Sequence, residues 1–226
     1  MWISEVFESV QGEGRYLGVP SGFIRTSGCN LRCVFCDTPY TSWKPEGVEQ
    51  SLEQLLNQID AMTSQHVVLT GGEPLLTPDM IPLTRSLKSR GLVITIETAG
   101  TVYRDEVQAD LMSISPKLRN SIPVGTNWEA RHEARRHRPD VIRDLTQNYD
   151  YQFKFVIDRR EDLAEVEAYL EEFPHVSPDK VYLMPQGIEM PVIAPKMPWL
   201  KEEAAKRGWH VTPRLHIELF GNTRGT

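Results

Sequence analysis

The 226-residue chain has no hydrophobic run long enough to cross a bilayer, because no stretch approaches about 18 consecutive apolar residues. Its first residues, MWISEVFESVQGEG, also lack the basic stretch and apolar core of a secretory signal. We therefore expect no membrane partner, and a cytoplasmic location in which thiols stay reduced.

The chain also has no excess of positive charge. Its 31 acidic residues outnumber its 25 basic residues, and the formal net charge is −6. A protein that binds nucleic acid by bulk electrostatics usually shows the opposite balance, so no direct nucleic-acid partner is expected. The basic segment 131–138 is the local exception. It indicates either an RNA-binding patch or, more often, a solvated helix face.

Cysteine is scarce. The chain has only Cys29, Cys33 and Cys36, which fall within eight residues of one another. An odd number of cysteines this close together is a poor disulfide framework. In a reducing compartment such a group more often binds a metal or performs redox chemistry.

The remaining sequence alternates between strand and helix patterns. We expect strands at residues 3–9, 22–26, 66–70, 92–98, 111–115, 151–157, 180–184 and 209–213, and helices at 51–62, 81–89, 160–173 and 199–207. Ser51 and Gln54 have the spacing of a capping box. Alternating strands and helices predict an α/β fold with a parallel sheet, here an open partial (βα) barrel of about six units. Such a fold places its ligands at the carboxyl ends of the strands.

The cysteines have the spacing C-x3-C-x2-C. Three thiolates on one loop can hold three corners of a [4Fe-4S] cube and leave the fourth iron without a protein ligand. A structural zinc site is the alternative and would need a histidine as its fourth ligand, with His66 the nearest in sequence. Three incidental buried cysteines are the remaining interpretation. The tight spacing favours the cluster.

The cysteine spacing, with the aromatic Phe35 before the last cysteine, resembles the radical S-adenosylmethionine (SAM) superfamily. The segment Thr70-Gly71-Gly72-Glu73-Pro74 agrees with this resemblance. Two glycines permit close backbone approach, and the Glu73 carboxylate can accept from the ammonium group of SAM. The resemblance implies that SAM binds the open iron through its amino and carboxylate groups.

Further motifs resemble the 7-carboxy-7-deazaguanine synthases across essentially the whole chain. They are SVQGEG (9–14), FIRTSGC (23–29), CDT (36–38), ET (97–98), SPK (115–117) and the tail from 215 to 225. The resemblance implies one abbreviated radical SAM domain spanning 1–226, with a substrate loop at about 9–21 and a cluster loop at about 28–42. It also implies a carbon–nitrogen lyase that is a homodimer and uses a [4Fe-4S] cluster, SAM and Mg²⁺.

The implied reaction is the ring contraction of 6-carboxy-5,6,7,8-tetrahydropterin to 7-carboxy-7-deazaguanine with loss of ammonia, a step toward queuosine. A 5′-deoxyadenosyl radical would remove a hydrogen atom from the substrate, after a reductant such as flavodoxin or ferredoxin supplies an electron. Two alternatives remain open. One is a radical SAM activase that makes a glycyl radical on a partner protein, and the other is a non-enzymatic iron–sulfur electron carrier.

The resemblance also implies the site residues. The substrate would contact Val10, Gln11, Gly12, Glu13, Arg25, Thr70, Glu97, His216 and Asn222. SAM would contact Phe35, Cys36, Asp37, Gly72, Glu73, Ser115, Pro116, Lys117, Met184, Pro185, Gln186 and Gly187. Cys29, Cys33 and Cys36 would hold the cluster and Thr38 the Mg²⁺.

Four of these residues have a plain structural alternative. Thr38 is of a type that often caps a loop, His216 is of a type that often sits hydrogen-bonded in a core, and Lys117 is of a type that often is a surface charge. Arg25 lies in an apolar strand with no charged neighbour from Phe23 to Ser27. A buried guanidinium costs free energy unless an anion pairs with it, so we expect Arg25 to pair with the substrate carboxylate.

Overall fold

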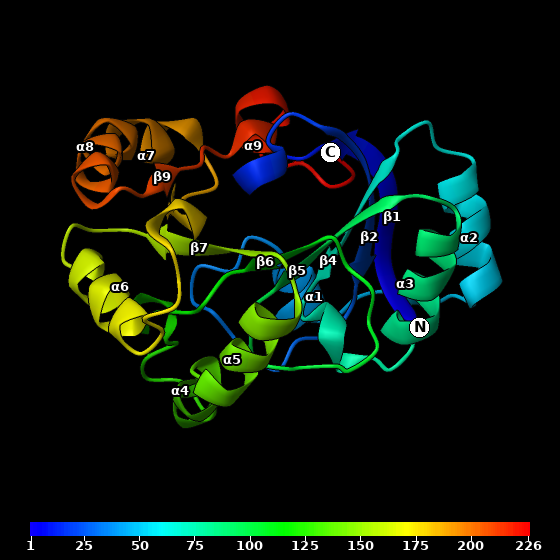
Figure 1. Cartoon of the computed structure of the whole chain (residues 1–226), viewed down its shortest axis with the longest axis horizontal. Coiled ribbons are helices and arrows are strands. Elements are labelled where there is room, and N and C mark those ends of the chain that lie inside the picture. The colour runs from blue at the N-terminus through cyan, green and yellow to red at the C-terminus, as the bar shows by residue number, and fades with distance from the viewer.

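A nine-stranded sheet runs through the computed structural model, which describes all residues from 1 to 226 (Figure 1). The strands are β1 (Trp2–Val10), β2 (Pro20–Thr26), β3 (Val48–Glu49), β4 (His66–Gly71), β5 (Val93–Thr98), β6 (Leu111–Ile114), β7 (Tyr151–Ile157), β8 (Val181–Pro185) and β9 (His210–Val211). Their spatial order is β3-β1-β2-β4-β5-β6-β7-β8-β9. Pairing is antiparallel around β1 and parallel from β2 to β9. The two edge strands, β3 and β9, do not pair with each other, so the sheet is open, as predicted.

Helices connect the parallel strands. They are α1 (Pro39–Ser42), α2 (Leu52–Asp60), α3 (Met80–Ser89), α4 (Glu129–Arg136), α5 (Pro139–Asn148), α6 (Asp162–Glu171), α7 (Met190–Ile193), α8 (Met197–Arg207) and α9 (Leu215–Phe220). Short 3₁₀ turns occur at η1 (Gly14–Tyr16), η2 (Pro74–Leu76), η3 (Arg119–Ser121), η4 (Pro178–Lys180) and η5 (Ala194–Lys196). The structure contains no helix that is both long and apolar enough to cross a bilayer.

The predicted elements agree with the structure to within a few residues. Ser51 caps α2 as expected: its hydroxyl accepts from the Gln54 N–H and the Gln54 side chain accepts from the Ser51 N–H. The sequence pattern did not predict the short strand β3 or the helices in residues 117–150. In that segment α4 exposes Arg131 and Arg135 and buries His132, so the basic residues lie on an outer face of a helix.

The core explains why the sheet is parallel. Strands β4 to β8 are apolar along most of their length, and their side chains form one cluster of 32 buried residues with α2, α3, α5, α6 and α8. Strands buried on both faces read as continuous apolar runs, which is the pattern of a helix-covered parallel sheet. The carboxyl ends of these strands therefore meet at one edge, and the loops that follow them form the site.

Two distant segments close over this edge. The Leu215 N–H of α9 donates to the Gly12 carbonyl at 3.0 Å, which ties the end of the chain to the loop after β1. Figure 1 shows α9 beside this N-terminal segment. A Cβ on Gly12 would lie 2.0 Å from the His216 ring, so the close approach requires glycine.

Candidate active site

A first cavity at the carboxyl ends of the strands contains the three cysteines. It is lined by the cluster loop, by the Gly-Gly turn after β4 and by the residues after β6 and β8. The turn lies directly on the cluster loop, because the Glu73 N–H donates to the Gly28 carbonyl at 2.9 Å. A Cβ on Gly72 would lie 2.1 Å from the same carbonyl oxygen. Close packing against the cluster loop is therefore the physical reason for glycine at this position.

The donor set fits an iron–sulfur cluster. Cys29, Cys33 and Cys36 are free thiols that line one cavity, and apolar side chains pack around them. Burial raises the pKa of the Cys29 and Cys33 thiols to about 12, so a metal must displace their protons on binding. Three cysteines can hold a multi-iron cluster and leave one iron open, whereas a structural zinc ion needs a fourth ligand.

The histidine needed for a zinc site is absent from this cavity. None of the residues that line it is a histidine. His66 is buried in the sheet, where its ring nitrogens lie 2.8 Å from the hydroxyls of Ser21 and Thr95. It is a hydrogen-bonded core histidine.

Most of the residues predicted to contact SAM line this cavity with the cysteines. They are Phe35, Cys36, Asp37, Gly72, Ser115, Lys117, Met184, Gln186 and Gly187. Pro116 and Pro185 lie outside the lining. Lys117 is held in place by a hydrogen bond of 2.7 Å from its Nζ to the Ser115 hydroxyl.

The structure corrects the expectation for the Glu73 carboxylate. Glu73 is 1% exposed and is absent from the cavity lining. Its oxygens accept from the Thr98 hydroxyl at 2.8 Å, the Ala99 N–H at 2.8 Å and the Leu75 N–H at 3.2 Å. Burial raises the pKa of this carboxyl although these donors act against the shift. Glu73 therefore ties the turn after β4 to the end of β5, and protein donors already occupy its oxygens.

A second cavity adjoins the first and contains every residue predicted to bind the substrate. Val10, Gln11, Gly12, Glu13, Arg25, Thr70, Glu97, His216 and Asn222 all line it. Both cavities are lined by Glu13, Asp37, Thr38, Thr70, Gly71, Glu97 and Arg214. Thr38 is one of these shared residues. It directly precedes α1 and makes no side-chain capping hydrogen bond to it. The two predicted ligand sites are therefore neighbours.

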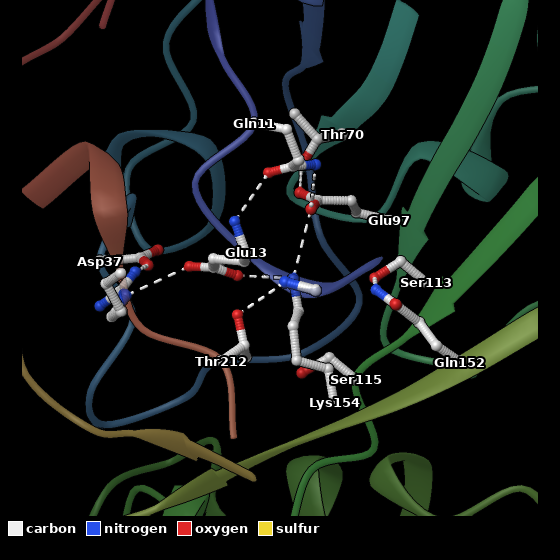
Figure 2. A network of polar contacts seen from close by, with 12 residues as sticks. Gln11, Glu13, Asp37, Thr70, Glu97, Ser113, Ser115, Gln152, Lys154 and Thr212 are labelled. Carbon is white, nitrogen blue, oxygen red and sulfur yellow. Dashed lines mark hydrogen bonds and ion pairs between the residues drawn. The ribbon is translucent and has the colours of Figure 1, made fainter. Parts of the chain in front are cut away.

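A buried lysine connects the two cavities. Lys154 of β7 is 5% exposed and its Nζ lies 2.5 Å from Glu13 and 3.2 Å from Glu97. Glu97 also accepts from the Thr70 hydroxyl at 2.9 Å and the Gln11 amide at 3.3 Å. Figure 2 shows the Lys154 side chain reaching both carboxylates.

Arg214 completes this network from the other side. Its guanidinium donates to Glu13 at 3.2 Å and pairs with Asp37. Burial alone would raise the pKa of the Glu13 carboxyl, but Lys154 and Arg214 outweigh burial and hold it well below its usual range. The pKa of Asp37 is also lowered, since Arg214 outweighs its burial. Glu13 is therefore an ionised acceptor at neutral pH.

The sequence interpretation missed Lys154 and Arg214. Lys154 had a detectable signal, because it interrupts the apolar strand YQFKFVI in the same way that Arg25 interrupts FIRTS. A cation at such a position must be paired. Arg214 lies two residues before His216, and no pattern in the sequence distinguishes it.

The reasoning that led to Arg25 was wrong in one respect. Arg25 does have a protein partner: its Nε donates to Glu5 at 2.7 Å, and Tyr40 donates to the same Glu5 oxygen at 2.9 Å. Glu5 is distant in sequence but lies opposite Arg25 in the antiparallel β1–β2 pair. The terminal guanidinium nitrogens make no protein hydrogen bond, and Arg25 lines the second cavity.

Comparisons with known proteins agree with this geometry. Residues 23–149 match the family described as the radical SAM superfamily. The chain is 46% identical to the 7-carboxy-7-deazaguanine synthase of Rhodopirellula baltica, covering 99% of this chain and 88% of that protein. It is 39% identical to the Halobacterium salinarum synthase, over 99% and 92%. The crystal structure of QueE from Escherichia coli superposes with a TM-score of 0.68 at 27% identity, covering 95% of this chain and 94% of that one. The chain therefore belongs to the radical SAM superfamily and, within it, to the 7-carboxy-7-deazaguanine synthases.

Proposed function

We propose that this chain catalyses the radical ring contraction of 6-carboxy-5,6,7,8-tetrahydropterin to 7-carboxy-7-deazaguanine, with release of ammonia, in queuosine biosynthesis. One observation carries the proposal: all nine predicted substrate residues line one cavity that adjoins the cavity of the three cysteines. Family membership supports the same reaction.

The first cavity would hold the cofactors of the superfamily. Cys29, Cys33 and Cys36 would bind the [4Fe-4S] cluster, and the Gly-Gly turn with residues 115–117 and 184–187 would surround SAM. When bound, these groups supply the hydrogen-atom abstraction that starts the ring contraction. The protein would position the substrate beside them, because the second cavity adjoins the first and shares lining residues with it.

The second cavity offers partners for both ends of a carboxylated pterin. Gln11 can donate and accept, and the ionised Glu13 can accept from ring N–H and exocyclic amine groups. The free nitrogens of Arg25 can hold the substrate carboxylate. Burial lowers the pKa of His216, so its neutral ring adds a hydrogen-bonding group without adding charge.

Thr38 would supply a hydroxyl ligand to Mg²⁺ at the junction of the two cavities. A hard cation that keeps several waters needs few protein ligands, and substrate oxygens would complete its shell. Thr38→Ala should weaken the Mg²⁺ dependence of turnover and leave the cluster absorbance unchanged. Unchanged Mg²⁺ dependence with full activity would remove Thr38 from the site.

The proposed function also implies an electron donor and an oligomeric state. The reaction needs one electron from a reductant such as flavodoxin or ferredoxin, and free thiols suit the reducing cytoplasm. We also propose a homodimer. Light scattering during gel filtration of the cluster-loaded protein tests this proposal, and a monomer at micromolar concentration would contradict it.

The deciding experiment is an anaerobic assay of the reconstituted protein with SAM, the carboxylated tetrahydropterin, Mg²⁺ and dithionite. Mass spectrometry should detect 7-carboxy-7-deazaguanine and ammonia should be released in equal amount. Cleavage of SAM without this product would show a radical SAM enzyme of another specificity. An absence of SAM cleavage would leave only the electron-carrier interpretation.

A further inference from the structure

The basic segment that the proposed function leaves unused lies on the outside of the cluster loop. His132 of α4 is fully buried, and its Nδ1 accepts from the Arg32 N–H at 3.1 Å. Its Nε2 lies 2.9 Å from the Ser121 hydroxyl, and the Ser121 carbonyl accepts from the Val34 N–H at 2.9 Å. The Arg135 guanidinium also donates to the Asn30 carbonyl. α4 and the loop before it are therefore attached directly to the segment between Cys29 and Cys36.

The positive charges on this part of the molecule are only partly neutralised. Residues 117–138 contain six basic and two acidic residues, whereas the whole chain has a net charge of −6. Arg136 and Arg138 form ion pairs with neighbouring carboxylates. Arg131 and Arg135 are exposed and form none. The face of α4 that carries them is locally positive on an acidic protein.

The two acidic residues of the segment do not cancel this charge. Glu133 pairs with Arg136, and the Glu129 carboxylate accepts from the Gly125 N–H at 2.7 Å. Arg131 and Arg135 therefore remain available to an anionic surface.

A third arginine extends the positive charge onto the cluster loop itself. The Arg32 guanidinium donates to the carbonyls of Cys29 at 2.8 Å and Leu31 at 2.7 Å. Its Cζ lies 4.1 Å from the centre of the Trp128 ring, and the Arg131 Cζ lies 5.6 Å from the same centre. The indole thus holds two arginines side by side over the loop that carries the cysteines.

Two exposed apolar side chains lie in the same segments as these charges. Val124 is 75% exposed and Val34 is 63% exposed, which makes them the most exposed large hydrophobic side chains of the chain. Val34 lies between Cys33 and Cys36, whose thiols line the cavity on the inner side of the loop. Apolar side chains surrounded by charged ones are typical of a transient protein interface.

We propose that this surface docks an acidic one-electron carrier protein that reduces the cluster. The surface, which we name the cluster face, consists of Arg32, Val34, Val124, Arg131 and Arg135. The proposal rests on the proposed function, since it requires a cluster held by the cysteines. Charge complementarity selects an acidic partner, and the surface is next to the thiols because Arg32 and Val34 belong to the cluster loop and Arg135 contacts it. The carrier is oxidised by one electron, the cluster is reduced by one electron, and no atom is transferred.

The test compares two doubly charge-reversed variants of the cluster-loaded protein. Arg131→Glu with Arg135→Glu alters the cluster face. Lys201→Glu with Lys206→Glu makes the same change in net charge on α8, which lies far from α4 in Figure 1. Calorimetry measures the binding of an oxidised bacterial flavodoxin and of a [2Fe-2S] ferredoxin. Stopped-flow absorbance measures reduction of the cluster by each reduced carrier and, separately, by dithionite.

We expect the α4 variant to bind at least one carrier about 10-fold or more weakly at low ionic strength, with reduction slowed to match. Rising salt should weaken carrier binding by the wild type and so reduce the difference in carrier affinity between the wild type and the α4 variant. Dithionite reduction and dithionite-driven SAM cleavage should stay at the wild-type level, which separates a failure of this proposal from a failure of the proposed function.

Wild-type carrier binding by the α4 variant, or an equal loss in the α8 variant, would overturn the proposal. A further titration with a fluorescent single-stranded RNA tests the other use of a basic surface. Loss of RNA binding in the α4 variant with unchanged carrier kinetics would assign the cluster face to RNA and would likewise overturn the proposal.

Discussion

At the scale of single residues, Arg25 pairs with Glu5 and is proposed to bind the substrate carboxylate as well. Glu5 accepts a hydrogen bond from Nε, and the terminal nitrogens make no protein hydrogen bond, which leaves them for the proposed carboxylate contact. Arg25→Ala should lower kcat/KM for the pterin about 30-fold or more and leave the cluster and uncoupled SAM cleavage unchanged, since a removed charged contact costs about 2–5 kcal/mol. Arg25→Lys should recover part of the loss, because an ammonium lacks the planar fork.

Glu5→Gln is the matched control for this prediction, because it removes the ion pair and keeps the guanidinium. It should lower kcat/KM much less than Arg25→Ala does. Steady-state kinetics decide the point. An equal loss in both variants would mean that Arg25 acts only through its pairing with Glu5.

Lys154 shows how one buried charge supports several others. Replacing it with Met leaves Glu13 and Glu97 without their shared cation, and removal of one partner from a buried ion pair costs about 3–5 kcal/mol. Lys180→Met, which breaks a more exposed pair with Asp150, should cost less than about 1 kcal/mol. Thermal unfolding of the cluster-loaded proteins measures both changes.

The pH dependence of the Lys154→Met effect has a definite sign. In the wild type the lowered pKa of Glu13 contributes stability that is present at neutral pH and lost as the pH falls through that lowered value. In the variant the pKa of Glu13 rises, so the carboxyl takes up a proton at a higher pH than it does in the wild type. The difference in stability should therefore narrow as the pH falls below about 4.5. A constant difference from pH 7 down to pH 3 would show that Lys154 acts by packing alone.

At the scale of elements, the Gly-Gly turn after β4 is packed on the backbone of the cluster loop. Gly72→Ala would place a Cβ 2.1 Å from the Gly28 carbonyl oxygen, which cannot move aside as a side chain can. We expect a loss of stability of about 1–3 kcal/mol and at least 10-fold weaker SAM binding, because the turn must shift into the cavity.

Gly91→Ala is the corresponding control. Gly91 has a φ of +76° in open space, so alanine there costs backbone strain only, about 1–2 kcal/mol, without any effect on SAM binding. Equilibrium binding of SAM to the reconstituted proteins separates the two variants. Normal SAM affinity in Gly72→Ala would show that the turn does not contribute to the SAM site.

At the scale of the whole molecule, the cluster should connect the loops that lie at the carboxyl edge of the sheet. A group that binds the folded state alone stabilises it by mass action, so removing the iron with a chelator should lower the melting temperature. Cys33→Ala should lose the visible absorbance of the cluster and the ability to cleave SAM. Its far-ultraviolet circular dichroism should stay that of the wild type, because the fold is retained. SAM cleavage at the wild-type rate in Cys33→Ala would contradict the cluster assignment.

The sequence by itself determined the features that depend on local patterns. Continuous apolar runs indicated the buried parallel strands, the spacing at 51–54 indicated a helix start, and three cysteines within eight residues indicated the cluster loop. The family motifs also predicted the lining of the second cavity. The strands, the helix start and the cluster loop could be predicted because each follows from residues that are close together in the chain. The cavity lining runs from Val10 to Asn222, so its prediction depended on the resemblance to the family.

Only the tertiary structure decided which charged groups meet. The β1–β2 register brings Glu5 to Arg25, and the parallel sheet brings Lys154 to Glu13 and Glu97. Folding of the turn after β4 directs Glu73 to β5 and away from the cavity. An ion pair requires approach within about 4 Å, and a chain of this length allows countless pairings of its charges. The register of the strands selects among them, and that register is a property of the whole sheet.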